Sequence, residues 1–459
     1  MSPVIKTDRV PTLGLIAFAL PAFISSLMKG PTASILPTIY AKYHGIDLAA
    51  IGTILMVTRM LDAVTDPAIG YLSDRTESPI GRRKPWIIAG YALTLLVIYF
   101  LFIPPEKITA FFFLFWFAIL YLAWTMAEIP YMAWQAELSH DYKQRTRIVT
   151  YRTVMFTLGG MAFAAFPLLP IFETSEFTPA VLRILAYAIL IGLPITVFIA
   201  VAFAPEGKRV ARRKTQSFFV MVKAIPKNKP MLSFVAIQIL FGLAAGMQSS
   251  VLFLWIDTYL LIGDKFALAL VIVNIVSLGG LPLWLKIINW IGKHRAWLVL
   301  QIGYIIVLPF FAFLEPGPQS FIPFMVLYIT IAIVIIGGDI MPNAIIGDII
   351  DYDTLKSGQN RAGQYSSILT LIMKANAAVG VGLGFFIVGK MGYDATATTH
   401  SAGAAAGLLT SLIWAPLILT TIATFFVWRF PLNERKQSII KRRIESLAAR
   451  AALSLEQEE

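Results

Sequence analysis

Twelve long apolar segments restrict the fold of this chain more than any other feature. The sequence has 459 residues, and each segment holds the roughly 20 mostly apolar residues that a helix needs to cross a bilayer. Short turns with Pro, Gly and polar residues separate the segments. Their ranges are 13–38, 48–72, 85–103, 110–134, 147–170, 180–204, 231–258, 266–290, 296–314, 320–347, 364–390 and 403–429. We therefore predict an all-α membrane protein with twelve transmembrane helices.

The composition agrees with a lipid environment and excludes several kinds of site. Apolar residues make up 58% of the chain, more than a soluble protein of this length can bury. There is no cysteine, which excludes disulfides and thiolate sites. A net charge of +12 would suggest nucleic acid binding in a soluble protein, but here the basic residues lie between apolar segments. We expect membrane lipids and a small molecule as partners, and no nucleic acid.

The distribution of Lys and Arg predicts the orientation. With the N-terminus placed in the cytoplasm, the cytoplasmic loops and ends hold 28 of the 38 basic residues, and the outer loops hold 4. Basic loops stay on the cytoplasmic side, and one missed span would invert every later loop. Both termini are therefore predicted to be cytoplasmic. No small-residue cleavage site ends the first apolar segment, so we interpret it as a retained span and not as a signal peptide.

The longest polar gap divides the chain into two halves of six spans. We predict an N-terminal six-helix bundle over 1–204, a basic cytoplasmic linker over 205–230, a C-terminal six-helix bundle over 231–430 and a cytoplasmic tail over 431–459. The tail has the pattern of a basic amphipathic helix. Two interpretations of it stay open: it lies on anionic lipid headgroups, or it is solvated and has no function of its own.

Three pairs of similar residues recur at one offset of 211 positions. They are Gly81 and Gly292, Glu128 and Asp339, and Glu137 and Asp348. Agreement of three offsets indicates duplicated, pseudo-symmetric six-helix halves. That is the architecture of major facilitator transporters, which bind their substrate between repeats near the middle of the membrane.

The loop after the second span resembles the cytoplasmic signature of that superfamily. It reads GYLSDR over 70–75 and GRR over 81–83. We expect Asp74 to pair with basic groups across the interface between the halves, and Arg75, Arg82 and Arg83 to join this charge network and help to gate the cytoplasmic side. The alternative is that the loop is a tight turn whose charges only follow the orientation rule.

Ionisable residues within a span cost free energy to insert, so they are candidates for function. The second span holds Arg59, Asp62 and Asp66 at a spacing that places all three on one helix face, with Thr65 beside them. Two carboxylates one turn apart repel each other unless a positive charge or a proton intervenes. Arg59 can neutralise one of them, and a bound Na⁺ or a proton can neutralise the other. The alternative is an ion-pair network that only holds helices together.

Further charged residues lie in other spans. Glu128 follows Trp124 by one helical turn in the fourth span, Arg152 lies in the fifth and Lys374 in the eleventh. Aromatic rings beside charged hydrogen-bonding groups suit sugars, which have apolar faces and hydroxyl-bearing edges. Lys29 in the first span has no explanation from the sequence beyond pairing with a carboxylate in the cavity.

These residues resemble the glycoside–pentoside–hexuronide:cation symporter family of the major facilitator superfamily over nearly the whole chain. The matching pieces are 59–67 with 84–86, 128–130, and 348–352 continuing to Lys374. The resemblance implies a coupling cation at Asp62 and Asp66, with Thr65 and Thr125 supplying hydroxyls. It also implies that the substrate contacts Glu128, Trp124, Arg152 and Lys374.

The chain departs from the family pattern in the substrate half. Ser26 stands where the family's galactoside carriers have an aspartate in the first span. The acid of the fourth span is Glu128 and not Asp, Met132 replaces a common tryptophan, and Asp339 replaces an aromatic residue. We therefore include Ser26 and Asp339 among the substrate-binding candidates, and we transfer no particular sugar from the family.

The predicted function is secondary symport, in which inward movement of Na⁺ or H⁺, or else Li⁺, drives uptake of a sugar, glycoside or sugar acid. An alternative on the same scaffold is transport of a lysophospholipid or another amphiphile. A membrane-embedded enzyme would place His, Asp or Ser clusters at the membrane interface, and none is evident, so we predict no catalytic residues and no cofactor besides the cation. The protein is expected to be a monomer in a bacterial inner membrane.

Overall fold

The computed structural model describes residues 10–33, 35–139, 141–206, 228–358, 362–397 and 400–456. Within them, eleven helices are long and apolar enough to cross a membrane. A twelfth candidate is the pair Gly263–Ser277 and Pro282–Ile291, bent by 44° at a short break. Pro282 accounts for the bend because its ring cannot continue the hydrogen-bond ladder of the helix. The prediction of an all-α membrane protein is confirmed, and the predicted span 266–290 is the bent one.

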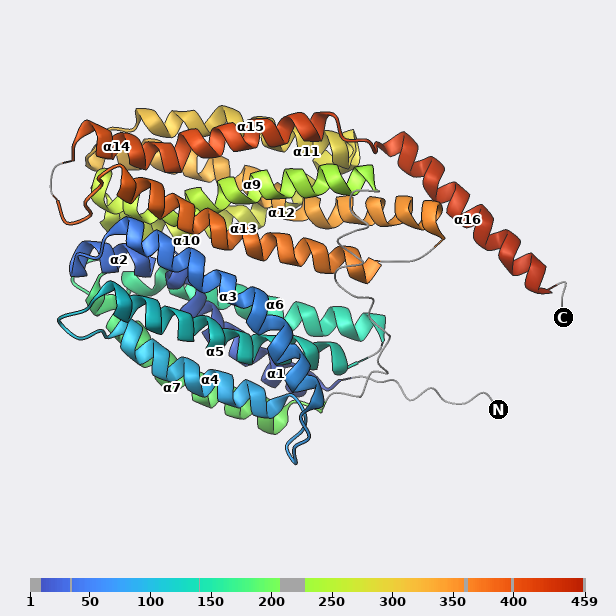
Figure 1. The fold of residues 1–459 in the computed structure, drawn as a ribbon, viewed down its shortest axis with the longest axis horizontal. Helices are drawn as coiled ribbons and strands as arrows, with labels where there is room; N and C mark the ends of the chain where they lie inside the picture. Colours follow the sequence, from blue (N-terminus) through green and yellow to red (C-terminus); the bar gives the residue numbers. More distant parts are fainter. Residues whose placement is uncertain are drawn as a thin grey trace. The chain divides into compact units, whose positions relative to one another are not determined.

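The first compact unit comprises 1–213, 249–271 and 381–408. Its main helices are α1 Thr12–Ala33, α2 Ile35–His44, α3 Leu48–Arg75, α4 Lys84–Phe102, α5 Ala110–Glu137, α6 Tyr142–Ala165 and α7 Pro179–Phe203. Helix α1 packs against α6 and α7, α4 packs against α5 and α7, and α3 packs against α5 (Figure 1). Helix α5 therefore has α3 on one side and α4 on another.

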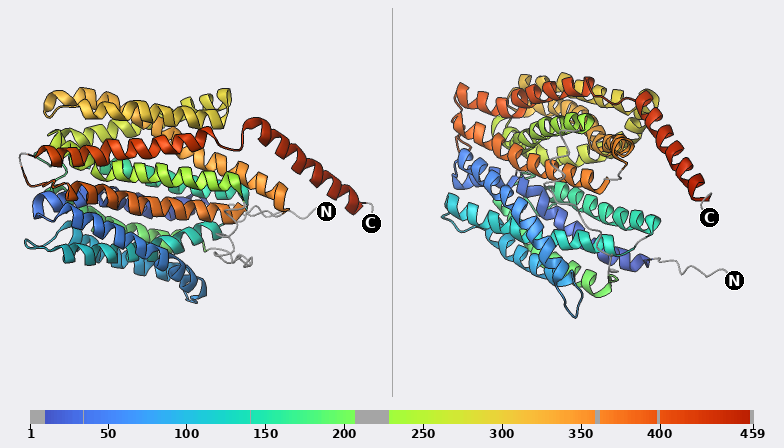
Figure 2. Two further views of the ribbon diagram at one scale, coloured as in Figure 1. Left: turned by 45° about the horizontal axis from the view of Figure 1, so that its top comes forward. Right: turned by 45° about the vertical axis from the view of Figure 1, so that its right-hand side comes forward.

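The second unit comprises 214–248, 272–380 and 409–459. The other long helices in the described part of the chain are α9 Lys229–Leu254, α10 Phe266–Ile291, α11 Lys293–Val307, α12 Phe321–Ser357, α13 Ala362–Lys390, α14 Ala402–Leu409, α15 Ala415–Trp428 and α16 Glu434–Glu456. In this unit α11 packs against α12 and α15. The tail helix α16, dark red in Figure 2, packs against the end of α12 and then projects from it.

The tenth predicted span, 320–347, differs most from the structure, because it continues as a 37-residue helix to Ser357. The first predicted span, 13–38, is covered by α1 and α2, which lie on either side of residue 34, a position outside the described residues. The predicted linker 205–230 lies mostly outside the described residues. The first compact unit contains 249–271 and 381–408 together with the first helices. The predicted division into six-helix halves over 1–204 and 231–430 therefore stays a prediction.

The repeat at offset 211 has the same local structure in each unit. Gly81 and Gly292 both adopt positive φ, +102° and +80°, a conformation that favours glycine. In the first unit Arg82 donates to Glu137 at 2.8 Å. In the second unit the equivalent pair, Lys293 and Asp348, is 2.5 Å apart. Each unit therefore begins its third predicted span with a glycine turn and a basic residue paired to an acid.

Candidate functional site

The charged face of α3 is anchored to α5. The Thr125 hydroxyl of α5 donates to Asp66 Oδ1 at 3.0 Å. Arg59 Nη1 lies 3.7 Å from Asp62 Oδ2, and the Arg59 guanidinium stacks 4.2 Å from the centroid of the Tyr121 ring, also on α5. Asp62 thus lies beside Arg59, and Asp66 accepts a hydrogen bond from Thr125. Both aspartates face α5, in agreement with their helical spacing.

Thr65 lies on the same face, and its hydroxyl hydrogen is bonded within the helix. Its hydroxyl donates to the carbonyl of Leu61 at 3.1 Å, within α3. A hydroxyl that donates in this way still has oxygen lone pairs for a cation. In their ionised forms Asp62 and Asp66 carry two negative charges, and Arg59 offsets one. The α3 face, defined as Arg59, Asp62, Thr65 and Asp66, therefore has the donors and the net charge of −1 that suit one monovalent cation.

Glu128 and Arg152 form an ion pair between α5 and α6. Both side chains are largely buried. Arg152 also donates to Gln135 Oε1 at 3.3 Å, and its guanidinium lies 5.0 Å from the centroid of the Tyr131 ring. Sequence analysis predicted Glu128 and Arg152 together but missed Gln135 and Tyr131, which the one-turn spacings along α5 could have suggested.

Trp124, one turn before Glu128, lies close to a lysine. The Lys29 ammonium of α1 is 5.9 Å from the centroid of the Trp124 ring and 5.5 Å from that of Phe156 on α6. Cation–π attraction extends to about 6 Å, so both rings favour the positive charge there. Three helices therefore meet at this point, and the lysine that the sequence left unexplained belongs to the same group of residues.

Ser26 lies in the packing contact between α1 and α6. It is 4% exposed, and a Cβ at Gly159 or Gly160 of α6 would come within 2.9 or 3.3 Å of its side chain. The neighbouring Ser25 hydroxyl lies 3.2 Å from that of Tyr91 on α4. This packing does not favour direct sugar contact by Ser26, whose role stays a prediction.

The two remaining substrate candidates belong to the second unit. Lys374 has an exposed side chain on α13. Asp339 is on α12, and its side chain lies outside what the structure describes. Their contribution to the site stays a prediction.

The predicted gating residues form a cluster where α3 ends and α4 begins. Arg83 pairs with Asp74 at 2.5 Å, donates to Glu137 Oε1 at 2.8 Å and donates to the Ser73 hydroxyl at 3.0 Å. Arg75 stacks on Tyr71, with 4.1 Å between guanidinium and ring centroid. Asp74 therefore pairs with Arg83 across the turn between α3 and α4, and the expected pairing across the interface between the halves stays a prediction. Whether the cluster gates transport stays a prediction.

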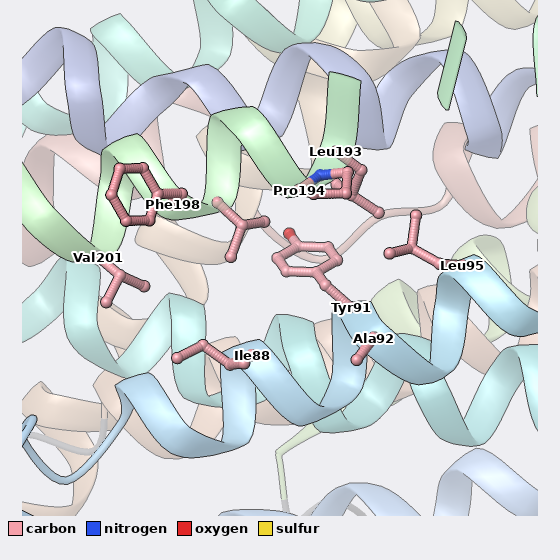
Figure 3. A pocket seen from close by; sticks show the side chains of 9 residues that line it. Ile88, Tyr91, Ala92, Leu95, Leu193, Pro194, Phe198 and Val201 are labelled. Atoms are coloured by element: carbon pink, nitrogen blue, oxygen red, sulfur yellow. The ribbon is translucent and has the colours of Figure 1, made fainter. Parts of the chain in front are cut away.

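An apolar pocket of about 250 Å³ lies between α4 and α7 (Figure 3). It is lined by Ile88, Tyr91, Ala92, Leu95, Leu193, Pro194, Val197, Phe198 and Val201. These side chains suit hydrocarbon and not a sugar, because only Tyr91 has a polar side-chain atom. That hydroxyl lies 3.2 Å from the Ser25 hydroxyl of α1.

Another ion pair of the first unit joins residues that are 215 positions apart. Lys42, in α2, donates to Asp257 Oδ2 at 2.7 Å. Burial alone would lower the pKa of the Lys42 ammonium, but the hydrogen bond and charge of Asp257 outweigh burial and raise it. Beside this pair Thr258 and Tyr393 share a hydrogen bond of 2.7 Å. Sequence analysis missed the contact because no local pattern links α2 to the end of α9.

Comparisons with known proteins agree with this fold. The profile of a family described as MFS/sugar transport protein matches residues 17–434. The uncharacterized symporter YnaJ of Bacillus subtilis is 24% identical, covering 96% of each chain. The glucuronide carrier protein homolog of Escherichia coli is 23% identical, covering 86% of this chain and 87% of the relative. The sodium-dependent lysophosphatidylcholine symporter 1-B of Danio rerio is also 23% identical, covering 84% and 80%.

A solved structure gives the same result for the architecture. The crystal structure of the nucleoside transporter NupG matches with a TM-score of 0.62 at 15% identity, covering 92% of this chain and 98% of that one. At this identity the likeness concerns the fold alone. It confirms the predicted major facilitator fold.

Proposed function

Because the chain belongs to the MFS/sugar transport protein family, we propose that it is a symporter in which Na⁺ or H⁺ entering the cell drives uptake of a saccharide. The observation that carries this proposal is the double role of α5. Thr125 on this helix reaches Asp66 of α3, and Glu128, one turn later, reaches Arg152 of α6. One helix thus links the residues proposed for the cation to those proposed for the substrate.

This link gives a physical basis for coupling. Asp62 and Asp66 are two carboxylates on one helix face, with Arg59 3.7 Å from Asp62, and in their ionised forms they repel each other. A cation held by their oxygens and by the Thr125 hydroxyl removes this repulsion and fixes α3 against α5. The fixed α5 then presents Glu128 and Trp124 in one orientation. Binding of the cation therefore raises the affinity for the substrate. By thermodynamic linkage, binding of the substrate raises the affinity for the cation by the same factor.

The substrate residues suit a saccharide. Glu128 accepts hydrogen bonds from sugar hydroxyls, Arg152 donates to sugar oxygens, and Trp124 offers a ring face to the apolar face of a pyranose. We place the protein in a bacterial inner membrane as a monomer with both ends in the cytoplasm. This placement follows the 28-to-4 distribution of basic residues and a relative named as an inner membrane symporter.

The second candidate is a lysophospholipid or a similar amphiphile. The specific observation in its favour is the apolar pocket between α4 and α7, whose lining has the Tyr91 hydroxyl as its one polar side-chain atom. An acyl chain fits such a pocket, and a charged headgroup would then lie at the Glu128–Arg152 pair.

One screen distinguishes the two candidates. The melting temperature of the purified protein is measured with a panel of saccharides and with lysophosphatidylcholine, in NaCl or in choline chloride, each at pH 5.5 and pH 7.5. Symport of a saccharide predicts that a sugar and one cation, Na⁺ or H⁺, stabilise the protein more together than the sum of their separate effects. Stabilisation by the lysolipid and by no saccharide supports the second candidate.

A further inference from the structure

We propose that the apolar pocket between α4 and α7 holds an acyl chain of a phospholipid from the cytoplasmic leaflet, and that a polar pocket beside it binds the phosphate and primary amine of the headgroup. The proposal concerns a resident lipid and does not depend on which solute is transported. It starts from two cavities of the first unit that adjoin at one hydrogen bond, in which the Lys84 ammonium donates to the Val201 carbonyl at 2.9 Å.

The apolar pocket is a groove that opens to the surface of the unit. Figure 3 shows side chains from both α4 and α7 lining it. At its rim Ile88 is 39% exposed and Phe198 is 69% exposed, whereas Leu193 is buried at its floor. An exposed apolar surface on two membrane-spanning helices faces lipid, so a hydrocarbon chain suits this groove.

The position of the groove along α4 matches the depth of one leaflet. Lys84 begins α4 at the end that the basic loops predict to be cytoplasmic. Ile88 and Leu95 lie about 6 and 16 Å farther along the helix axis, at 1.5 Å per residue. Half of the hydrocarbon core of a bilayer is about 15 Å deep. A chain in the groove therefore has its carbonyl end near Lys84 and its methyl end near the middle of the membrane.

The polar pocket, of about 350 Å³, has the charges of a headgroup site. Its lining includes three basic and three acidic residues: Arg82, Arg83, Lys84, Glu77, Glu137 and Glu206. The Lys84 ammonium has three hydrogens and gives one of them to Val201, so two can reach a phosphate. The phosphate of a lipid whose chain lies in the groove is at this level.

The acids of this pocket favour a headgroup with a primary amine. Glu206 lies at its edge, where Oε1 is 3.3 Å from the position of a Cβ added at Gly81. A primary ammonium donates three hydrogen bonds to carboxylates or other acceptors, whereas a trimethylated amine donates none. Phosphatidylethanolamine has both the phosphate and the primary amine, and it is the occupant that this pocket fits.

The charges also have a simpler role, because Arg82 and Arg83 both pair with Glu137 and fix the turn between α3 and α4. That role involves neither Lys84 nor Glu206. Lys84 begins α4 and Glu206 follows the end of α7, so these two residues flank the groove at its cytoplasmic end. A lipid in the groove accounts for a lysine and an acid at this place.

The test measures thermal stabilisation of the purified full-length protein by one added phospholipid at a time. The probes are phosphatidylethanolamine, phosphatidylcholine and phosphatidylglycerol with identical acyl chains, each titrated in detergent micelles to give an apparent dissociation constant. We expect phosphatidylethanolamine to bind about tenfold more tightly than either other lipid, the effect of one hydrogen bond to a charged group.

Two variants divide the chain site from the headgroup site. Ala92→Trp places a large side chain in the groove and should abolish stabilisation by all three lipids. Leu96→Trp, one turn later on α4, is its control, because Leu96 is 49% exposed and is not part of the groove lining. Glu206→Gln should weaken phosphatidylethanolamine to the level of phosphatidylcholine and leave phosphatidylcholine unchanged. Glu173→Gln, at an exposed acid in the loop before α7, should change neither.

Ala92→Met, which fills less of the groove, replaces the Trp variant if that protein does not purify as a single species, and it should lower the affinity for all three lipids. The proposal is overturned if another lipid binds the wild type as tightly as phosphatidylethanolamine, or if filling the groove leaves lipid binding unchanged. It is also overturned if Ala92→Trp abolishes transport of lysophosphatidylcholine, because the groove would then hold the solute and not a resident lipid. Unchanged binding of the solute by a variant that has lost the phospholipid supports it.

Discussion

Thr125 on α5 donates a hydrogen bond to the carboxylate of Asp66 on α3, with Oγ1 and Oδ1 3.0 Å apart. The two residues are 59 positions apart in sequence and come from helices that pack side by side. The bond fixes the register between the helix with two adjacent carboxylates and the helix with Trp124 and Glu128. The first two predictions below follow from this arrangement and the ion pair beside it, and the next two concern an ion pair and a glycine turn elsewhere in the chain.

Thr125→Val should weaken cation binding while keeping the shape of the side chain. The variant removes the hydroxyl that holds Asp66, and we expect the cation concentration for half-maximal stabilisation to rise about tenfold, the effect of one hydrogen bond to a charged group. Thr125→Ser keeps the hydroxyl and should stay near the wild type. Melting curves over a series of NaCl concentrations, repeated as a pH series, measure the effect. Equal cation dependence of the Val and Ser variants would contradict the assignment of Thr125.

Replacing one partner of the Glu128–Arg152 pair should destabilise the protein more than replacing both. Glu128→Gln leaves a largely buried arginine without its acid, a loss of about 3 kcal/mol at most because the pair keeps some solvent access. The double variant Glu128→Gln with Arg152→Gln should recover part of this stability and still bind no sugar. Melting temperature and sugar binding are measured on the same samples. Sugar binding by the double variant would show that the pair is only structural.

Lys42→Met should loosen the contact between α2 and the end of α9. The chain has no cysteine, so a single Thr258→Cys reporter can be labelled with a maleimide without background. We expect faster labelling of this cysteine when Lys42 is replaced, because Asp257 loses its 2.7 Å partner. Lys265→Met is the control, since its pair with Asp264 is exposed and 3.4 Å long. Unchanged labelling with Lys42→Met would show that other contacts hold these segments together.

Gly292→Ala should destabilise the protein by about 1–2 kcal/mol, because alanine at φ +80° is strained. Its Cβ would also lie 2.8 Å from Glu434 Oε2. Gly347→Ala is the control in the same unit. That glycine is within α12, no atom lies within 4 Å of an added Cβ, and alanine should stabilise the helix slightly. Chemical or thermal unfolding of the two variants, compared with wild type, gives the result; equal stability would refute the role of the turn.

Sequence analysis predicted most spans because the length and hydropathy of a membrane helix are local properties. It also placed Arg59, Asp62 and Asp66 on one face, since helical spacing decides this alone. The extension of α12 to Ser357 was missed, and so was the bend of α10, although Pro282 is a visible signal for it in the sequence. For the site, too, the residues that share one helix face could be predicted from the sequence, whereas contacts between helices could not.

Contacts between helices depend on how each helix is rotated, which one sequence does not specify. Ser26 illustrates this, because Gly159 and Gly160 allow α6 to pack closely against α1 and bury the serine. The Lys42–Asp257 pair and the position of Lys29 over Trp124 likewise arise only from packing. The repeat at 211 positions was the one long-range feature visible in sequence, because it is a similarity of segments and not a contact.

The most direct test of cation coupling is uptake by proteoliposomes that contain Asp66→Asn. The probe is whichever labelled saccharide stabilises the purified wild type most, and an inward Na⁺ gradient or an inward H⁺ gradient drives its accumulation. The wild type should concentrate the saccharide with one of the two gradients. Asp66→Asn should fail to concentrate it with either gradient and still exchange it between the two sides when no gradient is present. Gradient-driven accumulation by Asp66→Asn at the wild-type level would contradict the proposal that this carboxylate binds the coupling cation.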